Sequence, residues 1–293
     1  MMFFTNKGRV YAKKAYRIPE AGRTAKGTNL VNIIELQDGE YVTAIIPITE
    51  FVEGEYLTMI TKYGVTKRTL LTDFEYQRKG GKIAIHLDDE DELIFVRHTR
   101  GDESLIIATR NGQAVRFDEN NVRAMGRTAR GVRGITLDGD DYVVGVALVD
   151  DTKTLLTVTE GGMGKRTSFS DFRQMKHRGG KGVTCHNITE KTGKLASVIT
   201  VADDDDIMMI TNEGTIIRTS VQGINVYSRT ATGVILMRLG DGAFINNVAR
   251  LEKTEEIEKE SAEVDKEIEN TPQPEVQKPE VERAALDSEE ESF

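Results

Sequence analysis

A motif of cations and small residues occurs five times along the chain, and its chemistry suits a polyanion. The copies read Arg-Thr-Ala-Lys-Gly from residue 23, Lys-Gly-Gly-Lys-Ile from residue 79, Arg-Thr-Ala-Arg-Gly from residue 127, Arg-Gly-Gly-Lys-Gly from residue 178 and Arg-Thr-Ala-Thr-Gly from residue 229. Gly and Ala let a backbone approach a polyanion closely, and Arg and Lys donate charge-assisted hydrogen bonds to phosphate. Five such loops at one place in a repeat favour polyanion binding over plain turns.

The cations of these motifs and those directly beside them are the candidate binding residues. They are Arg23, Lys26, Arg78, Lys79, Lys82, Arg127, Arg130, Arg133, Arg178, Lys181 and Arg229. No recognition helix, zinc finger or run of stacking aromatic residues accompanies them, so nothing in the sequence is suited to reading bases. We therefore expect salt-sensitive binding to the backbone of duplex DNA that must bend.

Signatures of catalysis and of bound cofactors are missing from the sequence. The four histidines form no metalloprotease or triad arrangement, and Thr159 stands where a P-loop at 159–166 would need glycine. The single cysteine, Cys185, lies beside His186 without a second Cys/His pair at zinc spacing, so a buried thiol is favoured over a metal site. We expect no active site, no metal and no cofactor in this chain.

The elements that position the basic motifs repeat with a period near 50 residues. The sequence Thr-x-x-Gly begins at Thr5, Thr61, Thr109, Thr159 and Thr211, each time after an apolar run. Around each copy we predict four short strands, illustrated by residues 105–108, 113–117, 132–135 and 142–146. Asn-Gly at 111–112 is a strong hairpin signal between the first two. This pattern predicts an all-β fold of propeller-like four-stranded blades rather than a sandwich.

More cations follow the glycine of Thr-x-x-Gly in each repeat, on the second predicted strand or directly after it. They are Lys13, Lys14, Lys67, Arg68, Arg116, Lys165, Arg166 and Arg218. If they share a face with the basic loops, they widen the basic surface. If they alternate to the other face, they are solvated strand charges. The sequence leaves both interpretations open.

Charge divides the chain into two parts. The net charge is -9, but residues 251–293 carry 16 acidic against 5 basic side chains, which leaves 32 acidic and 34 basic residues in 1–250. We predict a folded domain at 1–250 and an acidic, disordered tail at 251–293, which either modulates nucleic-acid binding or only aids solubility. The lone cysteine suits a reducing cytoplasm, and no apolar stretch approaches the ~20 residues of a membrane helix. A soluble, intracellular protein is expected.

Two of the motifs point to a known family. Gln-Arg-Lys-Gly-Gly-Lys at 77–82 and His-Arg-Gly-Gly-Lys-Gly at 177–182 resemble the basic box, Gln-Arg-Arg-Gly-Gly-Lys-Gly, of the C-terminal domain of the DNA gyrase A protein. Residues 3–11, 125–134 and 207–211 are similar to that family as well, so that the resemblance runs from residue 2 to about 250. Its close relative is the corresponding domain of topoisomerase IV, whose boxes are fewer or more degenerate.

The resemblance implies a β-pinwheel, a disc whose blades exchange strands and around whose basic rim duplex DNA wraps. As the non-catalytic part of a type IIA topoisomerase, such a domain supports ATP-dependent negative supercoiling by the full enzyme. Its implied partners are the gyrase A breakage-reunion domain and the gyrase B protein, in a heterotetramer on the bacterial nucleoid. ATP and Mg²⁺ would act at other domains or subunits. The family's catalytic tyrosine lies outside the matched region, so we expect no DNA cleavage by this chain alone.

Two departures from the family pattern keep other interpretations open. The family's disc has six blades with the full box in the first, whereas five repeats are visible here, and the nearest copy of the box ends in Ile83 instead of Gly. These departures predict a fragment of a gyrase A protein. The alternatives are the equivalent domain of topoisomerase IV and a propeller-type protein-interaction scaffold. A scaffold would carry varied residues in its loops, whereas these loops repeat one cationic chemistry.

Overall fold

A computed structural model describes residues 1–22, 25–76 and 80–251. Arg23, Arg78, Lys79 and the acidic tail from residue 252 onward lie outside the described residues, so the predicted domain boundary stays a prediction. The described part consists of β-strands and short 3-10 helices, which confirms the predicted all-β class. Across these ranges, no helix has the length and apolar character to cross a membrane.

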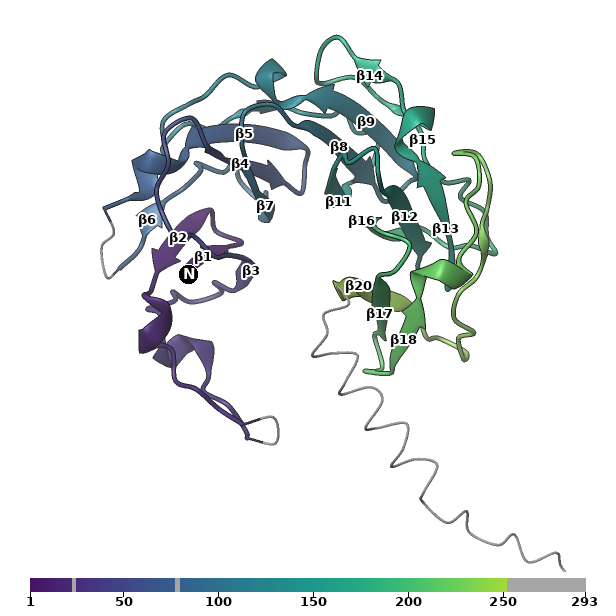
Figure 1. The fold of residues 1–293 in the computed structure, drawn as a ribbon, viewed down its shortest axis with the longest axis horizontal. Helices are drawn as coiled ribbons and strands as arrows, with labels where there is room; N and C mark the ends of the chain where they lie inside the picture. Colours follow the sequence, from purple (N-terminus) through teal and green to yellow (C-terminus); the bar gives the residue numbers. More distant parts are fainter. Residues whose placement is uncertain (23–24, 77–79, 252–293) are drawn as a thin grey trace, which may run out of the picture. The chain divides into compact units, whose positions relative to one another are not determined.

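Five small sheets follow one another in the order of the sequence (Figure 1). The strands of the first two sheets, in spatial order, are β3 (Val42–Ile46), β1 (Met2–Thr5), β2 (Arg9–Ala12) and β6 (Lys82–Ile83), and then β10 (Val132–Arg133), β5 (Val65–Leu70), β4 (Tyr56–Thr61) and β7 (Leu93–Thr99). The third contains β11 (Val143–Leu148), β8 (Ser104–Thr109), β9 (Gln113–Asp118) and β14 (Gln174–Met175), with β15 (Val183–Thr184) also paired to β9.

The fourth and fifth sheets complete the series. The fourth contains β16 (Leu195–Val201), β12 (Thr154–Thr159), β13 (Met163–Ser168) and β19 (Val234–Ile235), and the fifth contains β18 (Ile216–Ser220), β17 (Asp206–Thr211) and β20 (Ile245–Leu251). Six 3-10 helices connect strands in the described ranges: η1 (Ala15–Arg17), η2 (Leu30–Asn32), η3 (Leu71–Phe74), η4 (Glu119–Asn121), η5 (Phe169–Asp171) and η6 (Val221–Gly223).

Neighbouring repeats exchange strands, as the resemblance implies. The short third strand of a repeat joins the sheet of the preceding repeat, where β6 pairs with β2, β10 with β5, β15 with β9 and β19 with β13. The motifs at 127, 178 and 229 directly precede β10, β15 and β19, and the motif at 79 ends in β6. These four motifs are therefore held over the second strand of the preceding sheet, and this is how the fold places the loops. Among the described residues, the motif at 23–27 is not followed by an exchanged strand.

The Thr-x-x-Gly motif makes the hairpin that joins the first two strands. In the second repeat, the Thr61 hydroxyl accepts a hydrogen bond from the Val65 N–H at 3.1 Å, and the Gly64 N–H donates to the Thr61 carbonyl at 3.0 Å. Gly64 has a φ of +80°, and a Cβ there would lie 2.8 Å from the side chain of Ile135 on the exchanged segment. Only glycine satisfies both the backbone conformation and the close packing.

The core lies between successive sheets. Met2 and Phe4 of the first sheet pack with Leu57 and Met59 of the second, and similar buried clusters join the second to the third, the third to the fourth and the fourth to the fifth sheets. Because the first strands of the repeats are covered on both faces, they read as largely apolar runs rather than as alternating patterns. This packing fills the core with side chains from strands and from the short 3-10 helices.

Candidate nucleic-acid interface

The predicted cations divide into two groups by exposure. Within the described ranges, the side chains of Lys26, Arg130, Arg133 and Lys181 are exposed, whereas those of Lys82, Arg127, Arg178 and Arg229 are partly buried. The exposed group can meet a ligand directly. The contacts of the partly buried arginines explain how the loops are held.

The first arginine of three motifs has an equivalent structural contact. Arg127 donates to the Ile83 carbonyl at 3.3 Å, Arg178 to the Arg133 carbonyl at 2.8 Å and Arg229 to the Thr184 carbonyl at 2.7 Å. Each acceptor lies on the exchanged strand that follows the preceding motif. The arginines therefore tie each loop to its predecessor and join the loops into a row, while the remaining guanidinium N–H groups stay available to phosphate.

The cation before the last glycine of two motifs pairs with an aspartate at an equivalent position. Arg130 contacts Asp88 with an N–O distance of 2.5 Å, and Lys181 contacts Asp138 at 2.9 Å. All four side chains are more than half exposed. Exposed pairs of this kind contribute only about 0–1 kcal/mol, so a phosphate can replace the carboxylate at little cost.

Removal of these two carboxylates is expected to strengthen duplex binding. Asp88→Asn with Asp138→Asn frees Arg130 and Lys181 and removes repulsion of phosphate, so we expect affinity at low salt to rise roughly three-fold to ten-fold. Fluorescence anisotropy with a labelled duplex measures this change. The control is Asp150→Asn, which removes a carboxylate that pairs with Lys153 outside the basic motifs. An equal gain in the control would assign the effect to net charge alone.

The second-strand cations answer the question that the sequence left open. Lys67 and Lys165 are completely buried, and Arg68 and Arg166 are almost so. Arg116 is partly buried. These residues are neither solvated strand charges nor part of an exposed basic surface. The remaining members of the set, Lys13, Lys14 and Arg218, are partly or fully exposed.

The two buried lysines donate to backbone carbonyls within or directly beside the basic motifs. The Lys67 ammonium donates to Ala84 at 2.6 Å and also to Arg127, and the Lys165 ammonium donates to Ser228 at 2.6 Å and to Arg229 at 2.5 Å. Burial lowers the pKa of both ammonium groups to about 8. The recurring Lys-Arg pairs at 67–68 and 165–166 were the available signal for this role in the sequence.

Two arginines of the second strands hold the turns ahead of the motifs. The Arg116 guanidinium donates to the Phe169 carbonyl at 2.8 Å, and Arg166 donates to the Ile224 carbonyl at 2.6 Å. The acceptors are the first residue of η5 and the residue directly after η6, and these 3-10 turns lead into the basic motifs at 178 and 229. The cations of the second strands thus support the loops from beneath.

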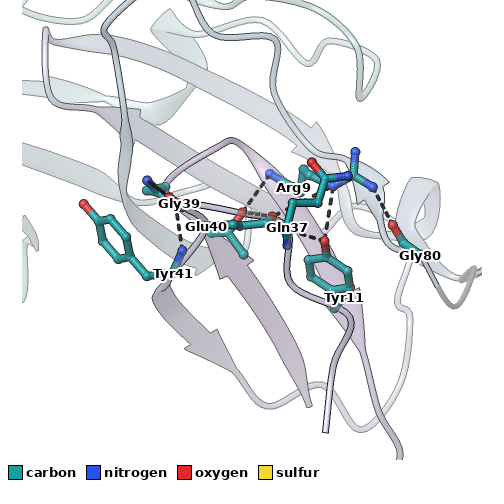
Figure 2. A network of polar contacts seen from close by, with 9 residues as sticks. Arg9, Tyr11, Gln37, Gly39, Glu40, Tyr41 and Gly80 are labelled. Carbon is teal, nitrogen blue, oxygen red and sulfur yellow. Dashed lines mark hydrogen bonds and ion pairs between the residues drawn. The ribbon is translucent and has the colours of Figure 1, made fainter. Parts of the chain in front are cut away.

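A network in the first repeat anchors the loop that follows residue 79 (Figure 2). The Arg9 guanidinium donates to the Gly80 carbonyl and, at 3.3 Å, to the Tyr11 hydroxyl. Tyr11 donates to the buried carboxylate of Glu40 at 2.8 Å, and Glu40 also accepts from the Thr5 hydroxyl at 2.6 Å. The first hairpin therefore fixes the box-like loop through one arginine.

The glycines of the motifs have different roles. A Cβ at Gly80 would meet nothing within 4 Å, and one at Gly180 would only approach the Gly182 amide at 3.9 Å, as expected where a ligand backbone approaches. Gly182 has a φ of +84°, and a Cβ there would clash with the Ala114 carbonyl. In the motifs that end at Gly131, Gly182 and Gly233, the last glycine is needed for packing on the preceding sheet, whereas Gly27 has open space around it. The sequence interpretation as a polyanion contact did not anticipate this packing role.

Substitution of the last glycine is expected to destabilise the fold strongly. Gly182→Ala introduces both left-handed strain and a clash with backbone, and we expect a loss of roughly 3 kcal/mol or more in the free energy of unfolding. Gly139→Ala is the matched control, because Gly139 has a φ of +62° but open space around its Cβ position. It is expected to lose about 1 kcal/mol. Chemical denaturation of both variants tests this, and equal losses would contradict the packing role.

Cys185 and His186 are structural, as the interpretation of a buried thiol predicts. Cys185 is completely buried, and burial raises its pKa to about 12. Burial lowers the pKa of His186 to about 4, so its ring is neutral. Its Nε2 donates to the Thr232 carbonyl at 3.1 Å, and its Nδ1 lies 2.9 Å from the Thr157 hydroxyl. Both ring nitrogens are therefore used within the protein.

A family model and a similar curated protein both match this chain and agree on the kind of domain. The family described as "DNA gyrase C-terminal domain, beta-propeller" matches residues 1–49, 55–100, 103–150, 153–202 and 205–252, one segment per repeat. The gyrase A protein of Staphylococcus epidermidis is 42% identical over 259 residues, which cover 87% of this chain and 29% of the relative. The chain thus spans less than a third of the length of that relative.

Two solved structures have a similar fold. The C-terminal domain of DNA topoisomerase IV superposes with a TM-score of 0.81 at 26% identity, covering 91% of this chain and 83% of that one. The DNA gyrase A C-terminal domain superposes with a TM-score of 0.74 at 28% identity, covering 86% and 82%.

Proposed function

Because the chain belongs to the family of DNA gyrase C-terminal domains, we propose that its row of basic loops binds duplex DNA and bends it around the edge of the repeat array. The observation that carries this proposal is the shared geometry of the loops. Arg127, Arg178 and Arg229 link each loop to the preceding exchanged strand, so the exposed cations recur at a fixed place in successive repeats. Cations that recur along a series of strand-exchanged sheets suit a duplex backbone that follows the series.

The activity of the whole protein is part of the same proposal. We propose that the chain serves as the DNA-wrapping part of a gyrase A protein and supports ATP-dependent negative supercoiling in the bacterial cytoplasm. Its partners would be the gyrase A breakage-reunion domain and the gyrase B protein. ATP and Mg²⁺ would act in those other parts, and the chain alone would not cleave DNA.

A topology assay tests wrapping directly. Relaxed closed-circular plasmid is incubated with the chain and a nicking-closing topoisomerase, and the linking number is read on a gel after the protein is removed. Wrapping is expected to leave a linking-number change that grows with the ratio of chain to plasmid and vanishes at high salt. Tight binding without any linking-number change would support a DNA-binding role and contradict wrapping.

A second candidate is the equivalent domain of topoisomerase IV. The TM-score of 0.81 to that domain favours it, whereas the 42% identity to a gyrase A protein favours the first candidate. The two differ in the activity of the complete enzyme. ATP-dependent supercoiling of relaxed plasmid by the assembled enzyme supports gyrase, and relaxation alone supports topoisomerase IV.

A further inference from the structure

We propose that Lys67 and Lys165 are positioning residues that fix the Arg-Thr-Ala loops of the following repeats in the conformation that binds DNA. The proposal rests on the DNA-binding function proposed above. It adds that two fully buried cations, which cannot touch DNA, determine the backbone conformation of two of the basic loops.

The two lysines make the same contacts in two places. Lys67 lies on β5 opposite Met59, and Lys165 lies on β13 opposite Thr157, so they occupy equivalent strand positions. Each ammonium donates to the carbonyl of the first arginine of the loop above it, Arg127 or Arg229. A second bond goes to Ala84 in one case and to Ser228 in the other. The repetition indicates a built feature rather than an accident of packing.

The residue at this strand position also differs with the type of loop that packs over it. The equivalent residues in the first and third repeats are Tyr11 and Val115, opposite Phe3 and Ile107. The loops that pack over Tyr11 and Val115 are of the Gly-Gly-Lys type, since Gly81 lies against the Tyr11 ring and Gly182 against the backbone at 114–115. Among these four described positions, lysine occurs beneath the Arg-Thr-Ala type. One strand residue therefore corresponds to one class of loop.

The groups around the two ammonium groups explain why a cation is needed at this strand position. Among the described residues, neither ammonium takes part in an ion pair with a carboxylate. Carbonyl dipoles stabilise each charge directly. The carboxylates of Asp73 and Asp171 act on Lys67 and Lys165 only from beyond ion-pair distance, so a cost of burying the charge remains. A neutral side chain of the same length would avoid this cost but leave the inward-facing carbonyls without a donor. The lysines thus fix the backbone of each loop, and the burial of their charge lowers the stability of the folded state.

Further contacts fix the rest of each loop. The Ala129 carbonyl accepts from the His86 N–H at 3.2 Å, and the Ala231 carbonyl accepts from the Asn187 N–H at 3.4 Å. With the first arginine held by the lysine and the third residue held by the preceding repeat, the start of each loop has a defined backbone. In the third repeat the fourth residue is the exposed Arg130, whereas in the fifth it is the partly buried Thr232. Loss of the lysine would free the start of the loop, and in the third repeat the Arg130 side chain would no longer be held in one orientation.

The test combines Lys67→Met and Lys165→Met, with Lys153→Met as the matched control. Lys153 pairs with Asp150, and its substitution removes the same kind of charge at a distance from the motifs. Hydrogen exchange is followed by mass spectrometry for residues 127–131 and 229–233, with 178–182 over Val115 as the internal reference. Binding to a duplex of about 40 base pairs, long enough to span several loops, is followed at low salt by anisotropy.

We expect exchange in the two Arg-Thr-Ala loops to accelerate at least ten-fold, while the reference loop and the sheets stay protected. Duplex affinity should fall about ten-fold in the double variant and less than two-fold in Lys153→Met. Lys67→Arg, which keeps buried donors, should recover part of both losses. Should the double variant not fold, each single Met variant is expected to affect only its own loop.

Two outcomes would overturn the proposal. One is unchanged exchange in both loops. The other is faster exchange with duplex affinity no lower than in Lys153→Met, which would show that binding does not depend on the loop conformation. A wild-type chain that does not bind duplex would refute the proposed function instead, and the exchange experiment separates the two because it needs no DNA.

Discussion

Replacing Arg127, Arg130, Arg178 and Lys181 by alanine is expected to lower the salt slope of duplex binding by roughly 3–4 units. Each cation that neutralises a phosphate releases counterions, and the slope of log affinity against log salt falls by about 0.9 per contact. Because these contacts are to the backbone, affinity should fall for all duplex sequences alike. Titrations at four or more salt concentrations, with two unrelated duplexes, measure both quantities.

The structure allows the fourfold variant to be divided into two informative pairs. Arg130 and Lys181 pair with exposed aspartates, so their replacement should reduce the slope by about 2 units with little change in stability. Arg127 and Arg178 also hold the loops to neighbouring carbonyls, so their replacement should in addition speed hydrogen exchange in the loops. Lys153→Ala is the control for a lost charge elsewhere. An unchanged slope in the fourfold variant would exclude these loops as the DNA surface.

Local structure could be predicted well from the sequence. The strand predicted at 105–108 is observed as Ser104–Thr109, and the one predicted at 113–117 as Gln113–Asp118, on either side of the predicted Asn-Gly hairpin. Thr-x-x-Gly marks the hairpins because its threonine and glycine have local roles within five residues. Signals of this range are readable in a single sequence.

The exchange of strands could not be worked out from the repeat pattern alone. β10 at Val132–Arg133 pairs with Val65 and Thr66, more than 60 residues earlier, and nothing in its own residues selects that partner. The resemblance to a family supplied this feature. The same non-local packing gives Gly182 its structural role, since its neighbour Ala114 belongs to the preceding sheet.

The buried lysines could not be identified for a related reason. A lysine on a strand between polar residues is usually solvated, because burial of an unpaired ammonium costs free energy. Lys67 is buried because the loop of the next repeat covers it and offers the Arg127 carbonyl, while the Ala84 carbonyl beside β6 accepts a second bond. The feature that reverses the usual preference therefore lies in a different repeat.

The buried lysines should also give the protein an unusual dependence of stability on pH. The pKa of each is lowered from 10.5 to about 8 in the folded state. Between these values the unfolded chain binds more protons than the folded one, so the free energy of unfolding rises with pH in this window. The cost of burying the charge is fully present below pH 8 and disappears as the pH approaches 10.5. It amounts to about 3 kcal/mol for each lysine.

The comparison that isolates this effect is between the wild-type chain and the double variant Lys67→Met with Lys165→Met. Cys185 opposes the trend, because burial raises its pKa to about 12 and the folded state then loses stability as the pH rises above 9. Tyr11 acts in the same direction as Cys185, since burial raises its pKa as well. The contribution of Tyr11 cancels in the difference. Cys185 and Lys165 interact with each other, so the single variant Lys67→Met shows the effect of a buried lysine without a change at Cys185.

Urea denaturation at pH 7, 8, 9 and 10 measures that difference. Between pH 7 and pH 10, the free energy of unfolding of the wild-type chain should rise, relative to that of the double variant, by about 2–3 kcal/mol per lysine. Single variants should each show half of the gain, because Lys67 and Lys165 serve different loops. A difference that stays constant across this range would mean that the two ammonium groups titrate normally, and so are hydrated in solution. In that case they would not hold the loops through buried carbonyls.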